Sequence, residues 1–224
     1  MTNSRRREWL VPSGLIALSL VPVAAGSARL AQLASGVAVT PENARFFDAP
    51  IPVIVHVIGA SAFCLLGAVQ FVPTLRGGRQ RWHRMSGRLI VPCGLAAALS
   101  GMWMAVFYAL PANDGVLLEA LRLGFGSAMV AALVLGVVCI MRRDVVRHRA
   151  WMMRGYAIGL GAGTQVLTNL PWIVLFGTPD VVVRALLMAA GWVINLAVAE
   201  YVIRGGRRRK SSDRPMRVTV SSVR

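Results

Sequence analysis

Six long apolar runs divide this sequence and leave only short polar segments between them. A helix needs about 20 predominantly apolar residues to cross a bilayer. In lipid, each backbone N–H and C=O group has to be satisfied within the protein, which favours helices for the spans. The runs cover approximately residues 10–27, 51–72, 89–110, 116–141, 156–176 and 181–203. We therefore predict an all-α, polytopic transmembrane helix bundle with six spans.

The composition agrees with a membrane protein and argues against a nucleic-acid-binding one. Charged residues make up 15% of the chain and hydrophobic residues 56%, whereas a soluble domain has about 25% charged residues. The formal net charge is +16, but the basic residues gather in the segments between apolar runs. That distribution is typical of membrane topology signals, so we expect the lipid bilayer as the partner and no nucleic acid.

Basic and nearly neutral connections alternate along the chain. Segment 76–88 carries five arginines and no acid, and segment 142–154 carries five arginines and one aspartate. Both termini are also basic, while the other three connections are close to neutral. Cytoplasmic loops are enriched in Lys and Arg. This pattern predicts that both termini and both arginine-rich loops face the cytoplasm, in a multi-pass protein of the bacterial cytoplasmic (inner) membrane.

We divide the chain into an N-terminal span with its outer loop (1–50), a five-span core (51–203) and a basic tail (204–224). The first apolar run follows arginines and precedes small residues, as in a cleavable signal peptide, but we expect it to stay as a first span because further spans follow. The tail has no apolar period and is expected to be disordered. Its basic start is expected to lie against anionic lipid headgroups and consists of Arg207, Arg208, Arg209 and Lys210.

Two of the three histidines, His83 and His148, lie in basic segments that precede apolar runs. Each is followed by glycines at helical spacing, which places the histidine at the end of a glycine-lined helix face. These glycines are Gly87, Gly94 and Gly101 after His83, and Gly155, Gly159 and Gly163 after His148. Small residues allow helices to pack closely in lipid. If both helices extend into their loops and pack together, the two imidazoles approach each other.

Two facing histidines are suited to ligate haem iron, and glycine faces leave room for a flat macrocycle. We therefore interpret His83 and His148 as ligands of haem b in a membrane redox protein. The alternative is that both are polar residues at the headgroup level, beside arginines that fix the topology and tryptophans of the interfacial belt. No thiolate or carboxylate lies beside them at zinc-ligand spacing, and the common hydrolase and nucleotide-binding motifs are not found in the sequence.

The second apolar run has its own polar face, with His56 and Gln70 fourteen residues apart and Phe63 between them. This spacing corresponds to roughly 21 Å of helix. A small transporter or channel, using His56, Gln70 and Arg122 along an interior path, is the alternative function, and a non-catalytic membrane partner is a third. The plainer interpretation of His56 is an interior residue with a hydrogen-bond partner.

Two ion pairs and three amide hydrogen bonds are also expected from local spacing and residue type. Arg122 lies three residues after Glu119, and Arg204 lies four residues after Glu200, so each pair is expected to interact on one helix. Three amides are expected to form hydrogen bonds between helices, and these are Gln165, Asn169 and Asn195.

Four short segments together resemble one protein family. They are residues 56–59 (His-Val-Ile-Gly), 66–71 (Leu-Gly-Ala-Val-Gln-Phe), 82–88 (Trp-His-Arg-Met-Ser-Gly-Arg) and 148–154 (His-Arg-Ala-Trp-Met-Met-Arg). Between about residues 56 and 171 the chain resembles a family of predicted bacterial membrane proteins described as domain of unknown function 2306, although Ala68 stands where the family is expected to have proline. The resemblance implies a multi-span membrane protein without an assigned activity. At the level of fold it is similar to multi-helix b-type cytochromes and ferric-reductase-like bundles.

Overall fold

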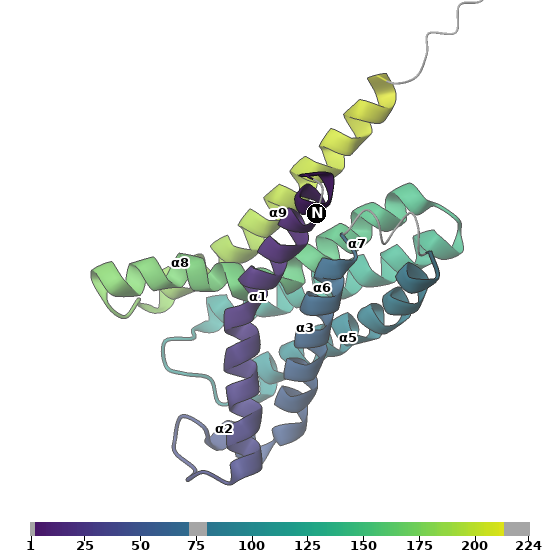
Figure 1. Cartoon of the computed structure of the whole chain (residues 1–224). Coiled ribbons are helices and arrows are strands. Elements are labelled where there is room, and N and C mark those ends of the chain that lie inside the picture. Colours follow the sequence, from purple (N-terminus) through teal and green to yellow (C-terminus); the bar gives the residue numbers. More distant parts are fainter. Residues whose placement is uncertain (1–2, 72–79, 213–224) are drawn as a thin grey trace, which may run out of the picture.

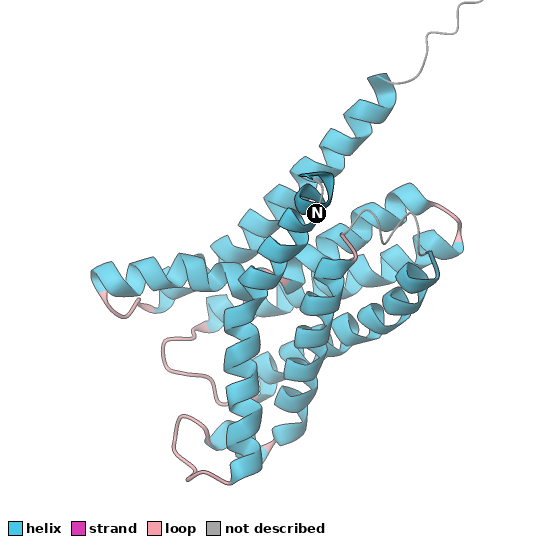
Figure 2. Cartoon of the chain, in the orientation of Figure 1, coloured by secondary structure: helices cyan, strands magenta, loops and turns pink. Residues whose placement is uncertain are grey.

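The computed structural model describes residues 3–71 and 80–212, and within them all regular structure is helical (Figure 2). The helices are α1 (Asn3–Ser35), α2 (Ala44–Asp48), α3 (Pro50–Val69), α5 (Gln80–Phe107), α6 (Val116–Met141), α7 (Val145–Gly159), α8 (Gly161–Phe176) and α9 (Val181–Ser212). The predicted all-α fold is therefore confirmed.

Five of these helices are long and apolar enough to cross a membrane, and a sixth span results when α7 and α8 are counted together. The sixth differs from the sequence prediction, because the run 156–176 is not one straight helix. It belongs to two helices that are bent by 40° at a break next to Leu160. Glycines at positions 159, 161 and 163 flank the break, and glycine has a low helix propensity, so the chain bends here at little cost.

Consecutive helices pack as hairpins, with α3 against α5, α6 against α7, and α8 against α9. Helix α1 completes the bundle by packing against α3 and α8. Figure 1 shows that α8 and the beginning of α9 project from the side of the bundle as a hairpin, and that α9 then runs past the other helices. The two central hairpins, α3–α5 and α6–α7, each carry one of the loop-proximal histidines.

The centre of the bundle is the ring of Phe63 on α3, which is only 1% exposed. A Cβ atom added to Gly94 of α5 would lie 2.6 Å from this ring, and one added to Gly159 of α7 would lie 2.5 Å from it. Leu133 of α6 is fully buried beside them. Four helices therefore meet at one phenyl ring. Any side chain at position 94 or 159 would collide with this ring, so glycine fits both positions.

This arrangement corrects the expectation that the glycine faces of α5 and α7 pack against each other. Helix α5 packs mainly against α3 and α6, and α7 packs mainly against α6 and α9. The two glycine faces do converge, but on the side chain of Phe63 from a third helix. The space expected for a flat cofactor in the middle of the bundle is thus filled by a side chain, because close packing of an aromatic ring stabilises the interior more than a void would.

Helix α9 continues as a helix to Ser212, beyond the end of the predicted span at 203. The rest of the tail lies outside the described residues, as do the side chains of Arg207, Arg208, Arg209 and Lys210. Their contact with lipid headgroups therefore stays a prediction. Along the spans, apolar side chains cover much of the exterior, as expected of helices whose solvent is lipid rather than water.

Candidate histidine site

Both loop-proximal histidines lie on regular helices, because α5 and α7 extend beyond their apolar runs into the basic segments. Helix α5 begins at Gln80, and α7 begins at Val145 after Asp144, whose carboxylate accepts a hydrogen bond of 2.9 Å from the backbone N–H of Arg147. Such a cap fixes the start of a helix. His83 and His148 each precede by eleven residues the glycine that touches the Phe63 ring. Both therefore lie about 16 Å along their helices from one point, at the same end of the bundle.

His83 is held by a chain of polar contacts between α3 and α5. Its Nδ1 contacts Oε1 of Gln70, and Nε2 of the same glutamine donates to the Ser86 hydroxyl at 2.5 Å. The Ser86 hydroxyl in turn donates to the Trp82 carbonyl oxygen at 2.6 Å. Because the glutamine oxygen only accepts, Nδ1 of His83 is the donor in this contact. One turn further on, no atom of the residues that the structure describes lies within 4 Å of a Cβ atom added to Gly87.

His148 uses the same ring nitrogen, but its partner is on a different helix. Its Nδ1 lies 2.7 Å from the carbonyl oxygen of Gly136 on α6. A carbonyl oxygen is an acceptor only, so Nδ1 of His148 donates this hydrogen bond. Met152, one turn later on α7, packs its sulfur onto Gly136. Histidines that ligate metals usually donate their other ring N–H to an oxygen in this way.

His56 lies inside the bundle with a hydrogen-bond partner, and this confirms the plainer interpretation of it. Its Nδ1 donates to the carbonyl oxygen of Ala97 on α5 at 2.8 Å. The ring also lies against Gly101, where an added Cβ atom would be 3.1 Å from Cε1 of His56. Between His56 and Gln70, a Cβ atom on Gly59 would come within 2.8 Å of the Cys93 backbone oxygen. The interface of α3 and α5 is thus closely packed between these two polar positions.

The three residues proposed for an interior path lie in different places. Gln70 contacts His83 rather than His56, and Arg122 lies at the opposite end of the bundle, where α6 begins. Among the residues that the structure describes, no group of three or more His, Cys, Asp or Glu side chains is placed to hold a metal ion.

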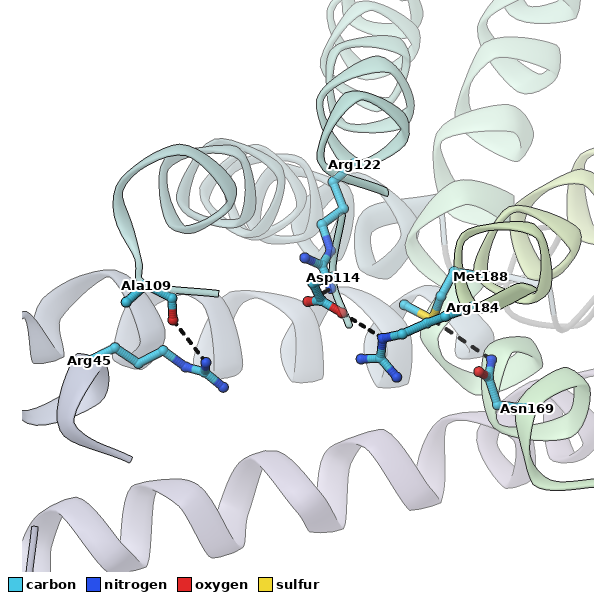
Figure 3. A network of polar contacts seen from close by, with 7 residues as sticks. All are labelled: Arg45, Ala109, Asp114, Arg122, Asn169, Arg184 and Met188. Atoms are coloured by element: carbon cyan, nitrogen blue, oxygen red, sulfur yellow. Dashed lines mark hydrogen bonds and ion pairs between the residues drawn. The ribbon is translucent and has the colours of Figure 1, made fainter. Parts of the chain in front are cut away.

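At that opposite end, Asp114 is the centre of an ion-pair network (Figure 3). Its carboxylate accepts from Arg122 at 2.7 Å and from Arg184 at 2.5 Å, and its side chain is only 4% exposed. The expected pairing of Arg122 with Glu119 is therefore wrong, because the buried Asp114 offers a stronger partner from the preceding loop. Neither Asp114 nor Arg184 was singled out from the sequence, since both interact across large sequence separations.

We expect Asp114→Asn to cost about 2 kcal/mol at neutral pH, because Arg122 and Arg184 would then face each other without a countercharge. Burial raises the pKa of the Asp114 carboxyl, but hydrogen bonds from Arg184 and Arg122, with their charges, lower it more, so that its pKa lies below the ordinary 3.8. The stabilisation is thus present above about pH 4 and is lost as the pH falls through the folded-state pKa. Thermal unfolding of the purified protein between pH 3 and 7 measures both effects. The exposed carboxylate of Asp48 supplies the control, Asp48→Asn, and equal behaviour of the two variants would contradict the prediction.

The remaining polar pairings join α9 to the bundle. The carboxylate of Glu200 lies 3.7 Å from Arg204, as expected, and also 2.5 Å from Arg154 of α7, which local spacing could not reveal. All three expected amides also contact the neighbouring helix. Gln165 donates to the Met188 carbonyl oxygen at 3.0 Å, Asn195 donates to the Ala157 carbonyl oxygen at 3.1 Å, and Asn169 lies 3.8 Å from the sulfur of Met188.

A helical bundle with an apolar exterior and five to six candidate spans defines an integral membrane protein. A family model described as "Predicted membrane protein (DUF2306)" matches residues 53–203, and the chain belongs to this family. The match confirms the resemblance seen in the four sequence segments and extends it through most of α9. No curated protein and no solved structure matches the chain.

Proposed function

We propose that this membrane protein binds haem b through His83 and His148 and acts in electron transfer. The observation that carries the proposal is that both imidazoles use the same ring nitrogen, Nδ1, for a hydrogen bond to an oxygen of the protein. Each contacts an oxygen from a neighbouring helix through Nδ1, at the same end of the bundle, and the proposal assigns iron ligation to the Nε2 atoms. A ring N–H held by an oxygen acceptor orients a histidine ligand and raises its basicity.

The packing favours a particular place for the macrocycle. The middle of the glycine faces is filled by Phe63, whereas no side chain of the described residues lies against Gly87. A haem beside His83 would therefore lie at the end of the bundle, along the first turns of α5. The exposed neighbours Trp82 and Met85 would supply apolar contacts to its ring there.

A visible spectrum of the protein purified in detergent from haem-replete cells tests this function. We expect a Soret band and a reduced α-band after dithionite, and loss of both in His83→Ala and in His148→Ala. His56→Ala is the matched control, since His56 lies deeper in the bundle, and it should keep the spectrum. A colourless wild-type protein would refute haem binding.

A second candidate, transport of a small solute, is favoured by the break between α7 and α8. Discontinuous spans are common at the binding sites of secondary transporters. Two polar side chains at this break, Thr164 and Gln165, are buried, and Thr164 donates to the Asn195 amide oxygen at 2.7 Å. A protein without haem that still needs Thr164 and Asn195 in vivo, in a growth assay on defined solutes, would support transport over electron transfer.

We further propose that both termini are cytoplasmic and that the membrane is the bacterial inner membrane. The support is the alternation of arginine-rich and neutral connections with the helices in place. Alkaline phosphatase fused after Gly78 or after Asp144 is expected to be inactive, and fused after Gly177 it is expected to be active. Activity at either of the first two sites would overturn the orientation.

A further inference from the structure

The end of the bundle opposite His83 and His148 gathers arginines from four separate helices. We call Arg29, Arg45, Arg122 and Arg184 the arginine cluster, and its members belong to α1, α2, α6 and α9. Figure 3 shows three of them, Arg45, Arg122 and Arg184, together with Asp114. In the sequence this concentration is hidden, because the connections that supply these residues also contain acids and are close to neutral.

Asp114 neutralises only part of the cluster. Its carboxylate is 4% exposed, while the side chains of its partners Arg122 and Arg184 are 23% and 26% exposed. The acid is therefore underneath and the guanidinium groups are partly open above it. A guanidinium has five N–H donors, so one carboxylate leaves several donors of each arginine directed elsewhere.

Arg29 and Arg45 are brought together by an aromatic ring rather than by an acid. Their guanidinium carbons lie 4.3 and 4.7 Å from the centre of the Phe46 ring. Arg45 also donates to the Ala109 carbonyl oxygen at 3.0 Å, and Arg29 donates to the Gln32 side chain at 2.6 Å. Within the described part of the chain, neither of these two arginines forms an ion pair with a carboxylate.

The other acids of this end form no ion pair with the cluster in the described part of the chain; they are Glu42, Asp48, Glu119 and Asp180. Asp180 is exposed and accepts from the backbone N–H groups of Val182 and Val183, which caps α9. Glu42 is exposed, and a hydrogen bond with Thr40 lowers its pKa. Burial lowers the pKa of Arg45, Asp114 raises it, and the nearby Arg29 and Arg122 lower it further. Asp114 is thus the one carboxylate in ion-pair contact with the cluster among the described residues, and the guanidinium groups of Arg29 and Arg45 have no carboxylate at contact distance there.

We propose that the arginine cluster binds a phosphate-bearing anion, either a phospholipid headgroup or free inorganic phosphate. Phosphate suits the site because its oxygens accept paired N–H bonds from several planar guanidinium groups at once. The cluster lies at the ends of the spans, at the level where phospholipid headgroups lie. This site is independent of the haem proposal, which concerns the other end of the bundle.

Isothermal titration calorimetry of the full-length protein in a non-ionic detergent tests the site with two probes. One probe is inorganic phosphate, and the other is dihexanoyl phosphatidylglycerol, with dihexanoyl phosphatidylcholine as the neutral-headgroup comparison. We expect Arg29→Gln with Arg45→Gln to weaken binding about tenfold or more, as expected for lost hydrogen bonds to a charged group. Arg142→Gln with Arg143→Gln, two exposed arginines at the opposite end, is the matched control and should bind as the wild type does.

Each result of the titrations either identifies the anion or overturns the site. Binding of phosphatidylglycerol alone assigns a lipid headgroup, and binding of inorganic phosphate assigns a site for the free anion. If the double variant does not fold, Arg29→Gln carries the test, because the guanidinium of Arg29 contacts only Gln32 on its own helix and the Phe46 ring among the described contacts, and forms no ion pair there. Binding of neither probe, or equal weakening in the control variant, overturns the proposal.

Discussion

Phe63→Ala is expected to lower the free energy of unfolding by about 3–5 kcal/mol, the cost of truncating a fully buried aromatic side chain. The ring is 1% exposed and fills the space between Gly94 of α5 and Gly159 of α7. Neither glycine has a side chain that could move into the cavity, so little of the loss is recovered by relaxation. Thermal or denaturant unfolding of the purified protein measures the effect.

The matched control for this substitution is Phe107→Ala, because Phe107 ends the adjacent helix α5 and is 65% exposed. We expect its free energy of unfolding to lie within about 0.5 kcal/mol of the wild-type value, as is usual for surface substitutions. A second variant, Phe63→Leu, keeps most of the apolar volume and should lose less than the alanine variant. If Phe63→Ala and Phe107→Ala were equally stable, Phe63 could not be the packing centre of the bundle.

The same ring shows how far sequence reasoning reaches in this protein. Helical spacing places Phe63 on one face of the second apolar run, between His56 and Gln70, and Phe63 is buried. Spacing also predicted that glycine faces of two spans point inward. It could not say which side chain meets them, because Phe63 comes from a different helix and its contacts depend on how three helices are oriented. A pattern along one helix defines a face, but the occupant of that face is a property of the assembly.

Long-range pairing limited the prediction of polar sites in a similar way. Glu200 with Arg204 was found because both lie on one helix turn, whereas Arg154 reaches Glu200 from another span. Asp114 was missed as the partner of Arg122, since a loop carboxylate eight residues away is not favoured by helical periodicity. The histidines themselves were identifiable because they are rare and lie at the ends of apolar runs. Their hydrogen-bond partners, Gln70 and Gly136, were not, since only the helix pairing reveals them.

The break between α7 and α8 is stabilised by two residues of α9, one contacting each side of the break. Because these residues are distant in sequence, the apolar run alone predicts one straight span. The ring of Trp192 on α9 lies on Gly161, where an added Cβ atom would be 2.3 Å from the ring. Asn195, one turn further along α9, donates to the Ala157 carbonyl oxygen. In lipid, a carbonyl group next to a helix break needs a partner from the protein. The neighbouring helix therefore stabilises a bend that the local sequence only permits.

Gly163→Ala is expected to destabilise the protein by about 2–3 kcal/mol, although alanine favours a helix over glycine by about 1 kcal/mol. The reason is that a Cβ atom on Gly163 would lie 2.2 Å from the backbone oxygen of Leu18 on α1. A backbone atom cannot rotate away, so α1 as a whole has to move from α8. Gly124→Ala on α6 is the matched control, since nothing lies within 4 Å of a Cβ atom there. It is expected to be neutral or slightly stabilising, and thermal unfolding of the two variants separates the effects.

A second measurement on Gly163→Ala locates the damage. If α1 moves from α8, limited proteolysis should cut the α1–α3 connection of the variant at least severalfold faster, while the connection between α6 and α7 keeps its wild-type rate. The contact also bears on the first apolar run, which resembles a cleavable signal peptide but which we expect to be retained as a span. A retained α1 covers Gly163 and packs Gly26 against Val57 of α3, whereas cleavage would uncover both surfaces. A variant as stable as Gly124→Ala would show that α1 does not hold the broken span, and the case for its retention would lose this structural support.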